Sequence, residues 1–202
     1  MALRELLQDI HTKAEESEFA TKLMSGNMDP VLYGLYLYNQ FQIYSALENR
    51  AIKFPFYIKN LKGMGRMFAL DADRLGYYYP IKMMPSTKRY MKYCENLTKE
   101  QVIAHLYVRH FGDMYGGQMI SKKIPACNAE GKSQHTDGYY YKFDGKSGYI
   151  NTIRSLLDDD MEPECRIVFQ YAIDLFKELT DYVIPETYPS KPRPTEHSGE
   201  NN

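Results

Sequence analysis

The sequence predicts an all-α, single-domain helical bundle. Apolar residues recur at helical spacing along most of the 202 residues, and capping signals mark where several helices begin. This length suits one domain with a sizeable core. We expect that domain to cover residues 1–184. Residues 185–202, rich in proline and polar side chains, are expected to form a disordered tail.

The first two helices are predicted from an apolar stripe and from a capping signal. Asp29 followed by Pro30 indicates the start of a long helix that reaches about Phe54, because aspartate caps helices and proline suits their first position. The stripe of the first helix consists of Leu3, Leu6, Leu7, Ile10 and Ala14.

The remaining elements follow from further caps and breakers. Thr98 with Gln101 three residues later resembles a capping box, and it opens a long helix that Pro125 ends. Ser86 is expected to cap the start of the preceding helix, over residues 86–97. The other expected elements are a loop over 55–65, helices over 67–75, 86–97, 147–157 and 163–183, and a loop with a short extended piece over 126–146.

Composition excludes several classes of protein. The formal charge is −1 and the pI is about 6.5, so no global field attracts nucleic acid or acidic lipid. The three cysteines form no CxxC pair, which argues against a zinc site or disulfide framework. Without a signal peptide or an apolar run of about 20 residues, we expect a soluble, cytoplasmic protein without membrane anchor. The 19 tyrosines fit either a polar-edged pocket or a tyrosine-rich core.

His11 is a candidate metal ligand on the apolar face of the first helix. A histidine in such a position is more often a core residue with satisfied hydrogen bonds. However, Glu15 lies one turn later and can accept a proton from one ring nitrogen, which leaves the other nitrogen free to bind a metal. Arg4 lies on the same face and offers a guanidinium to an anionic group.

Gly112, Gly116 and Gly117 form a second unusual feature, inside the helix that follows Thr98. Each interior glycine costs about 0.8–1 kcal/mol relative to alanine. Either a second helix packs closely on the bare backbone, or a flat ligand lies against it. Asp113 lies among these glycines, and Arg109 lies one turn earlier, an arrangement suited to ordering water.

Both features resemble parts of the heme oxygenase family. The segment YVRHFGDMYGGQMISKK (107–123) resembles the family signature, and LRELLQDIHTKAEESEF (3–19) resembles its proximal helix. The segments IYSALE (43–48), KRYMK (88–92), RSLL (154–157) and LFKEL (175–179) follow in the family's order. The resemblance covers about residues 3–180 and implies a bundle that holds heme between the first helix and a glycine-kinked distal helix.

The resemblance also implies roles for individual residues. His11 is similar to the axial ligand of the heme iron, with Glu15 as its hydrogen-bond partner, and Asp113 to the aspartate that organises distal water. The backbone at Gly112, Gly116 and Gly117 is expected against the heme face. The implied distal network contains Tyr44, Arg109 and Tyr90, and the implied propionate-binding residues are Arg4, Tyr107 and Arg154.

The implied reaction is the oxidative cleavage of heme b, as both substrate and cofactor, to biliverdin IXα, CO and ferrous iron. Oxygen is the oxidant, and a ferredoxin or another reductase is the expected electron donor. A downstream bilin reductase is a possible partner. In soluble members of bacterial, algal or phage type, to which the chain is similar, ferredoxin is the usual donor.

Some positions depart from the family pattern. Gln8 and Ile150 stand where basic residues are expected, and Ala172 stands where the distal network has an asparagine, so that water or Tyr171 must close the network. These changes keep open the alternative of a heme carrier or sensor, which would have no need of Asp113. A thiaminase-like enzyme on the same fold would need a pocket cysteine, and neither motif contains one.

Overall fold

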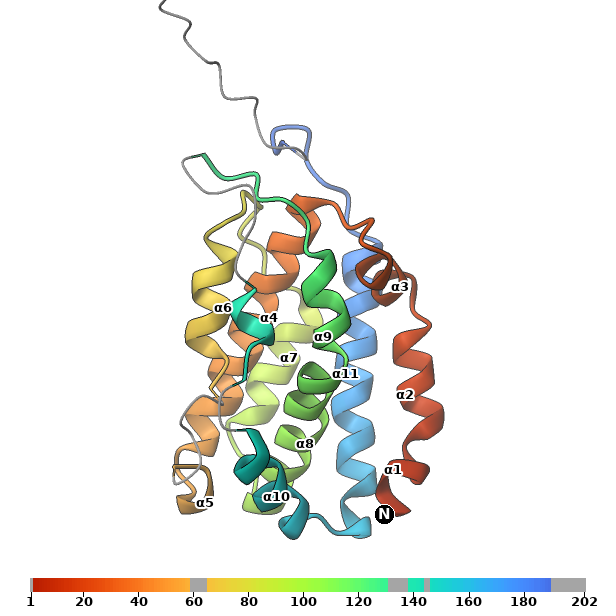
Figure 1. The fold of residues 1–202 in the computed structure, drawn as a ribbon, viewed down its shortest axis with the longest axis vertical. Coiled ribbons are helices and arrows are strands. Elements are labelled where there is room, and N and C mark those ends of the chain that lie inside the picture. Colours follow the sequence, from red (N-terminus) through yellow and green to blue (C-terminus); the bar gives the residue numbers. More distant parts are fainter. Residues whose placement is uncertain (1, 59–64, 131–137, 144–145, 190–202) are drawn as a thin grey trace, which may run out of the picture.

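The computed structural model describes residues 2–58, 65–130, 138–143 and 146–189, and every regular element in these ranges is helical. Most helices run along the long axis of the molecule (Figure 1). The prediction of an all-α fold is therefore confirmed. In chain order the helices are α1 (Ala2–Leu6), α2 (Gln8–Glu15), α3 (Glu18–Ser25), α4 (Pro30–Ala51), α5 (Pro55–Ile58), α6 (Met67–Arg74), α7 (Pro85–Cys94), α8 (Lys99–Tyr115), α9 (Gly117–Ile120), α10 (Lys146–Leu156) and α11 (Glu162–Thr180), with short 3-10 helices η1 (Ser121–Lys123), η2 (Tyr139–Tyr141) and η3 (Asp159–Met161).

Helices α4 and α11 are the central elements of the bundle: α6, α7 and α8 pack against α4, and α2, α3, α7 and α8 pack against α11. The start of α4 is as predicted: Asp29 Oδ1 accepts hydrogen bonds from the backbone N–H groups of Val31 (2.8 Å) and Leu32 (3.4 Å). Its side chains are buried around most of its circumference, which explains why it shows no clear polar face. The helix ends at Ala51, three residues before the predicted end.

The predicted capping box of α8 is confirmed. Gln101 N–H donates to Thr98 Oγ1 (3.3 Å), and Thr98 N–H donates to Gln101 Oε1 (2.9 Å). The reciprocal pair satisfies two backbone donors that a helix start otherwise leaves free. Helix α8 ends at Tyr115, and the chain continues through Gly116 into α9 and η1 before Pro125.

The N-terminal segment differs from the single straight helix that was predicted. It breaks at Leu7 into α1 and α2, and Leu6 is 44% exposed. Leu3 and Leu7 instead share a small buried cluster with Ala104 of α8 and Cys165 of α11, packed against Ile10, Tyr107, Val108 and Phe169. The break lets both leucines enter this cluster and turns Leu6 outward.

Three other predicted elements are corrected. Helix α7 begins at Pro85 rather than after a Ser86 cap, because proline fits the first helical position and Ser86 instead donates its N–H and hydroxyl to the carboxylate of Glu178. The predicted 55–65 loop begins with the single turn α5, and its residues 59–64 lie outside the described residues. The segment 139–141 is a 3-10 turn instead of an extended piece.

The chain after α11 is described as far as Pro189. Ile184 packs against the main core, and Asn128 Nδ2 donates to the carbonyl oxygen of Pro189 (2.7 Å). Residues 190–202, the greater part of the predicted tail, lie outside the described residues. Among the helices that the structure describes, none has the length and apolar character needed to cross a membrane.

The three glycines of the α8–α9 region have different surroundings. A Cβ at Gly112 would meet no atom within 4 Å, and a Cβ at Gly116 would meet only the carbonyl oxygen of Gly112, at 3.0 Å. A Cβ at Gly117 would come closer to the ring of Tyr141 than real Cβ atoms approach, so Gly117 permits close packing of η2 on α9. The bare backbone at Gly112 is therefore open, while that at Gly117 is filled.

This difference predicts opposite effects of two substitutions on the stability of the protein. Gly117→Ala should lower the free energy of unfolding by roughly 1–3 kcal/mol, because the buried Tyr141 ring has no room to shift. Gly112→Ala should raise it by about 0.8–1 kcal/mol, because alanine is the better helix former and its methyl group meets nothing. Urea unfolding of both variants measures these changes. Equal destabilisation by the two substitutions would contradict this account of the open face.

Candidate active site

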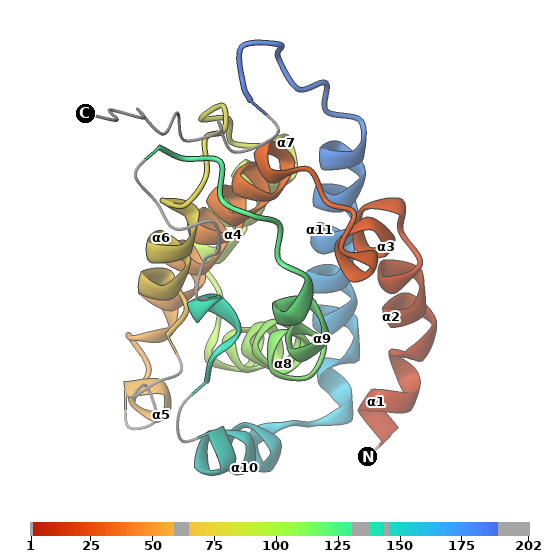
Figure 2. The ribbon, with the colours of Figure 1, turned by 45° about the horizontal axis from the view of Figure 1, so that its top comes forward.

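The open backbone at Gly112 of α8 and the side chain of His11 on α2 both lie next to one small apolar cluster. Leu7 and Val108 both belong to that cluster, and His11 and Gly112 each follow one helical turn later. Helix α2 continues from the cluster toward α3, and α8 continues toward α9 (Figures 1 and 2). His11 and Gly112 therefore each lie one turn beyond the same cluster.

His11 presents a half-exposed imidazole on α2. Its side chain is 45% exposed, and the ring meets Phe169 of α11 edge-on at 5.7 Å between centroids. Nδ1 lies 3.3 Å from Glu15 Oε2, yet the geometry there is not that of a hydrogen bond, and Nδ1 is buried without a hydrogen-bond partner. A small rotation of the exposed Glu15 side chain would complete the bond that was predicted from the sequence.

Asp113 extends from α8 toward two tyrosine hydroxyl groups. Its Oδ2 accepts a short hydrogen bond from Tyr44 of α4 and a second one, 2.8 Å long, from Tyr140 of η2. Burial raises the pKa of the carboxyl group to about 6, while the two hydroxyls and the charges of Arg109 and Arg66 oppose this rise. The carboxyl group therefore titrates near neutral pH, where it can accept or release a proton.

Arg109 lies buried one turn before Asp113. Its Nη1 donates to Gln40 Oε1 (3.4 Å), and its guanidinium lies over the ring of Tyr90 at 4.7 Å. Nε and Nη2 are buried and have no hydrogen-bond partner among the residues that the structure describes. Buried guanidinium donors are costly to leave unpaired, so this group is suited to receive an acceptor such as water or an oxygen-bearing ligand.

Tyr90 continues the polar chain away from Arg109. Its hydroxyl lies 2.7 Å from His105 Nδ1, and His105 Nε2 lies 2.8 Å from Glu164 Oε1. Tyr171, the predicted substitute for the family's asparagine, meets the ring of Tyr90 edge-on at 5.2 Å. The contact places Tyr171 beside the network.

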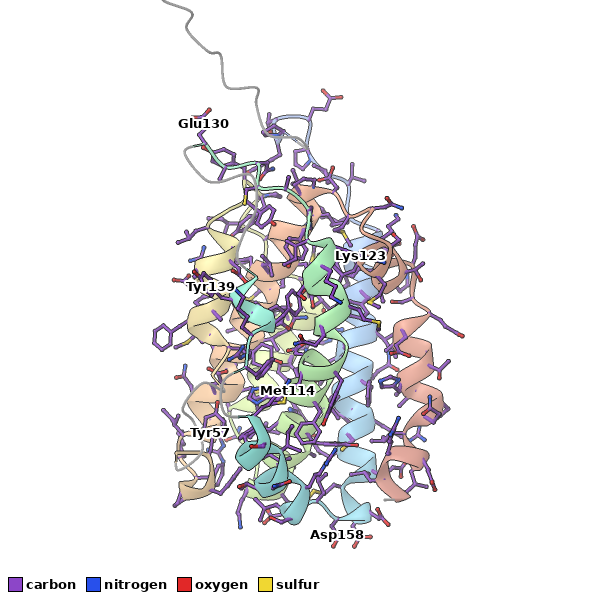
Figure 3. The ribbon with its side chains drawn as sticks, in the orientation of Figure 1. Tyr57, Met114, Lys123, Glu130, Tyr139 and Asp158 are labelled. Atoms are coloured by element: carbon purple, nitrogen blue, oxygen red, sulfur yellow. The ribbon has the colours of Figure 1, made fainter. Side chains whose placement is uncertain are left out.

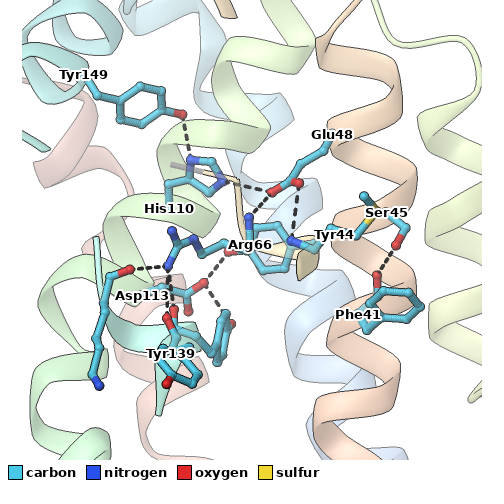
Figure 4. A network of polar contacts seen from close by, with 12 residues as sticks. Phe41, Tyr44, Ser45, Glu48, Arg66, His110, Asp113, Tyr139 and Tyr149 are labelled. Carbon is cyan, nitrogen blue, oxygen red and sulfur yellow. Dashed lines mark hydrogen bonds and ion pairs between the residues drawn. The ribbon is translucent and has the colours of Figure 1, made fainter. Parts of the chain in front are cut away.

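Behind Tyr44 lies a buried cluster that supports it (Figure 4). The ring of His110 stacks on Tyr44 at 5.6 Å, and its Nδ1 lies 2.7 Å from the Tyr149 hydroxyl. Burial, together with the nearby charge of Arg66, lowers the pKa of His110 to about 3, so this imidazole is neutral. Glu48 accepts hydrogen bonds from the backbone N–H groups of Arg66 and Met67 and so caps the start of α6.

The three residues predicted to bind propionates gather near one another. Burial raises the pKa of Tyr107, and the positive charges of Arg4 and Arg154 act on the same hydroxyl to oppose this rise. Arg154 Nη2 also donates to the Tyr115 hydroxyl (3.4 Å). Both arginines are exposed, and together with Tyr107 they form a positively charged edge with a phenol donor.

Most predicted site residues thus fall into two groups. Asp113 is hydrogen-bonded to Tyr44, and the charge of Arg109, whose guanidinium lies over Tyr90, acts on Asp113. Arg4, Tyr107 and Arg154 form the charged edge. The structure separates Gly117 from the open face, since Tyr141 covers it.

Sequence reasoning missed Tyr140 and Gln40. Nothing distinguishes Gln40 within a helix that is buried all round. For Tyr140 there was a signal, because three consecutive tyrosines in a polar, glycine-bearing segment are unusual unless that segment is anchored in the core.

Comparison with known proteins shows the family of the chain. Heme oxygenase of Pyropia yezoensis is 32% identical over 88% of this chain and 84% of that protein, and heme oxygenase 1 of Rattus norvegicus is 26% identical over 96% and 76%. The crystal structure of heme oxygenase-1 from the cyanobacterium Synechocystis in complex with heme has the same fold, with a TM-score of 0.73, 23% identity and coverage of 88% of this chain and 90% of that chain. The sequence model described as heme oxygenase matches residues 1–178. With its fold and its site segments in agreement with this match, the chain belongs to the heme oxygenase family.

Proposed function

We propose that this heme oxygenase would hold heme between α2 and the open backbone of α8, with His11 as the ligand of the iron and Asp113 as the carboxylate that controls protons on the opposite side of the site. The reaction of the family is the oxidative degradation of heme to biliverdin. The observation that carries the proposal is the open face at Gly112, which adjoins a buried carboxyl group with a pKa near 6. A helix forgoes side chains at such a place when something flat must approach its backbone.

The residues present fit heme in three respects. The open backbone accommodates a planar ring, the half-exposed imidazole of His11 offers an iron ligand, and the two unpaired donors of Arg109 accommodate a polar distal side. When bound, heme supplies the iron at which oxygen reacts and is itself the molecule oxidised. The protein supplies orientation, the exclusion of bulk water and the control of protons.

Each group then has a defined task. Glu15 orients the imidazole of His11 by accepting a hydrogen bond from its Nδ1–H, which leaves Nε2 as the ligand atom. Asp113 holds a water molecule on the distal side and passes a proton through it, with Tyr44 fixing the carboxylate and Arg109 sharing the same water network. The ring of Tyr90 lies against the face of the Arg109 guanidinium and so orients it.

Arg4, Tyr107 and Arg154 are proposed to bind the propionates and so to set which edge of the ring lies near Asp113. Guanidinium groups and a phenol are suitable donors for carboxylates. The orientation selects the bilin isomer, for which we propose IXα. A bilin reductase is the class of enzyme proposed to consume the product.

The imidazole of His11 provides the first test. His11→Ala should abolish biliverdin formation and change the visible spectrum of the heme complex, because the axial ligand is lost. Added imidazole should restore part of the activity. Thr12→Ala, a change at the next position of α2, serves as the control and should behave as the parent protein. Normal turnover by His11→Ala without imidazole would exclude His11 as the ligand.

Asp113 provides the second test. Asp113→Ala should bind heme as the parent protein does, yet form biliverdin at least ~10-fold more slowly, the lower range of general acid–base effects. Asp113→Asn, which keeps the shape but not the charge, should also be impaired. In the parent protein, turnover should decrease as the pH falls through about 6, where the carboxyl group becomes protonated.

Heme absorption and bilin absorption after addition of reductant in air measure these quantities. Asp71→Ala, which removes a surface carboxylate paired with Arg74, is the control. A parent-like rate for Asp113→Ala would refute the proposed role. Unimpaired heme binding without turnover in the parent protein itself would instead favour the carrier alternative.

We further propose that a ferredoxin-type donor docks at Lys122 and Lys123. These lysines end η1, which directly follows α9 and packs against α3, the helices that follow α8 and α2 in the chain (Figure 3 labels Lys123). Lys123 Nζ donates to the carbonyl oxygen of Met24 (2.7 Å), while Lys122 is exposed. A second group of basic residues, Lys88, Arg89 and Lys92, lies on α7, which packs against α4 and α11. In this group Arg89 pairs with Asp174 (3.1 Å).

Charge reversal tests this docking site. Lys122→Glu should slow turnover with reduced ferredoxin at low salt, because the donor of this class is acidic, and should not affect turnover with ascorbate. The difference should diminish between 0.01 and 0.1 M salt, as the Debye length decreases from ~30 to ~10 Å. Lys92→Glu makes the same charge change on α7 and is the matched control. An equal loss in both variants would remove the case for a docking site at η1.

A further inference from the structure

We propose that Tyr140 is a positioning residue for Asp113, and that its hydroxyl, with that of Tyr44, occupies one carboxylate oxygen so that the other serves the distal water. This inference rests on the proposed role of Asp113. It adds a residue from η2 to a site that the sequence motifs assign to α2, α4 and α8. No motif that resembles the family includes Tyr140.

The contacts of Asp113 carry the first step. Tyr140 Oη donates to Asp113 Oδ2 at 2.8 Å, and the Tyr44 hydroxyl donates to the same oxygen. Within the described part of the chain, Oδ1 has no hydrogen bond to protein. Two donors on one oxygen restrict rotation of the carboxylate about its Cβ–Cγ bond. The remaining oxygen is therefore the one that can bind water.

The second step concerns how η2 is held. The buried carboxylate of Asp73 accepts hydrogen bonds from the backbone N–H groups of Tyr139 (3.1 Å) and Tyr140 (2.8 Å). Arg66 Nη1 donates to the carbonyl oxygens of Tyr140 (3.0 Å) and Lys142 (2.6 Å). Both charged groups are buried, so these bonds are strong and shielded from water. They hold the backbone of η2 and thereby the hydroxyl of Tyr140.

The third step is electrostatic. Burial raises the pKa of Tyr140 well above 10, so its hydroxyl remains a donor throughout the working range of pH. Its hydrogen bond favours the ionised form of Asp113 and opposes the effect of burial. The other groups that act on this carboxyl are Tyr44 and Tyr36 of α4, Arg109 of α8, and Arg66, which directly precedes α6.

The neighbouring Tyr141 offers a matched comparison. It is 2% exposed, against 1% for Tyr140, and both residues belong to the same turn. The hydroxyl of Tyr141 accepts a hydrogen bond from Tyr33 (3.4 Å) instead of contacting Asp113. The substitutions Tyr140→Phe and Tyr141→Phe therefore remove the same group from the same turn, and only one of them removes a bond to Asp113.

The test begins with the heme-free protein labelled with 13C at aspartate carboxyl carbons. NMR titration should show that Tyr140→Phe raises the pKa of Asp113 by about one unit, the shift expected for loss of a hydrogen bond to a charged acceptor. Tyr141→Phe should leave it near the parent value. The urea midpoint of Tyr140→Phe should show that the protein remains folded, because the ring is kept. With heme, the acid limb of the pH profile should move upward by the same amount in Tyr140→Phe alone.

The outcomes separate this inference from the proposed function. An unchanged pKa of Asp113 in Tyr140→Phe, or an equal shift in Tyr141→Phe, would overturn the positioning role, whatever the activity. If the pKa shifts while Asp113→Asn turns over heme normally, Tyr140 does position Asp113 but the proposed role of that carboxylate is wrong. If Tyr140→Phe shifts both the pKa of Asp113 and the acid limb of the pH profile of turnover, the result would support the positioning role of Tyr140 and the proposed role of Asp113.

Discussion

The carboxylate of Asp113 imposes a requirement on four parts of the chain. A charge removed from water needs hydrogen bonds and nearby opposite charge, or it becomes protonated. The groups that meet this need are Tyr44 of α4, Tyr140 of η2, Arg109 of α8 and Arg66, which directly precedes α6. These contributions keep the pKa close to neutral pH, although burial would move it further upward.

Supporting residues show how far this requirement extends. Tyr44 is backed by the neutral ring of His110, which Tyr149 holds, and η2 is anchored by Asp73 and Arg66. Their role is to remove freedom from the hydroxyls that do contact Asp113, which is how enzymes keep a functional group in a productive orientation.

The sequence was sufficient for the elements with strong local signals. Asp29 with Pro30 and Thr98 with Gln101 marked helix starts correctly, because capping is a contact between residues close in sequence. Ser86 was assigned wrongly because its partner, Glu178, lies in α11, far along the chain. The run of three tyrosines indicated a segment anchored in the core, but no local pattern reveals that Tyr140 contacts Asp113 and Asp73. Motifs identified His11 and Asp113, but only the fold could show that Gly112 is open while Gly117 is filled.

The open backbone at Gly112 links the lifetime of the protein to its supply of ligand. A ligand that binds only the folded state adds RT ln(1 + [L]/Kd) to the free energy of unfolding, about 2.7 kcal/mol at a hundredfold excess over Kd. The face at Gly112 forgoes stabilising packing, so the empty protein is expected to unfold more readily and to meet cellular proteases more often. Release of product returns the chain to that weaker state after each turnover. Mass action would thus make the abundance of the enzyme follow the availability of heme without any dedicated regulator.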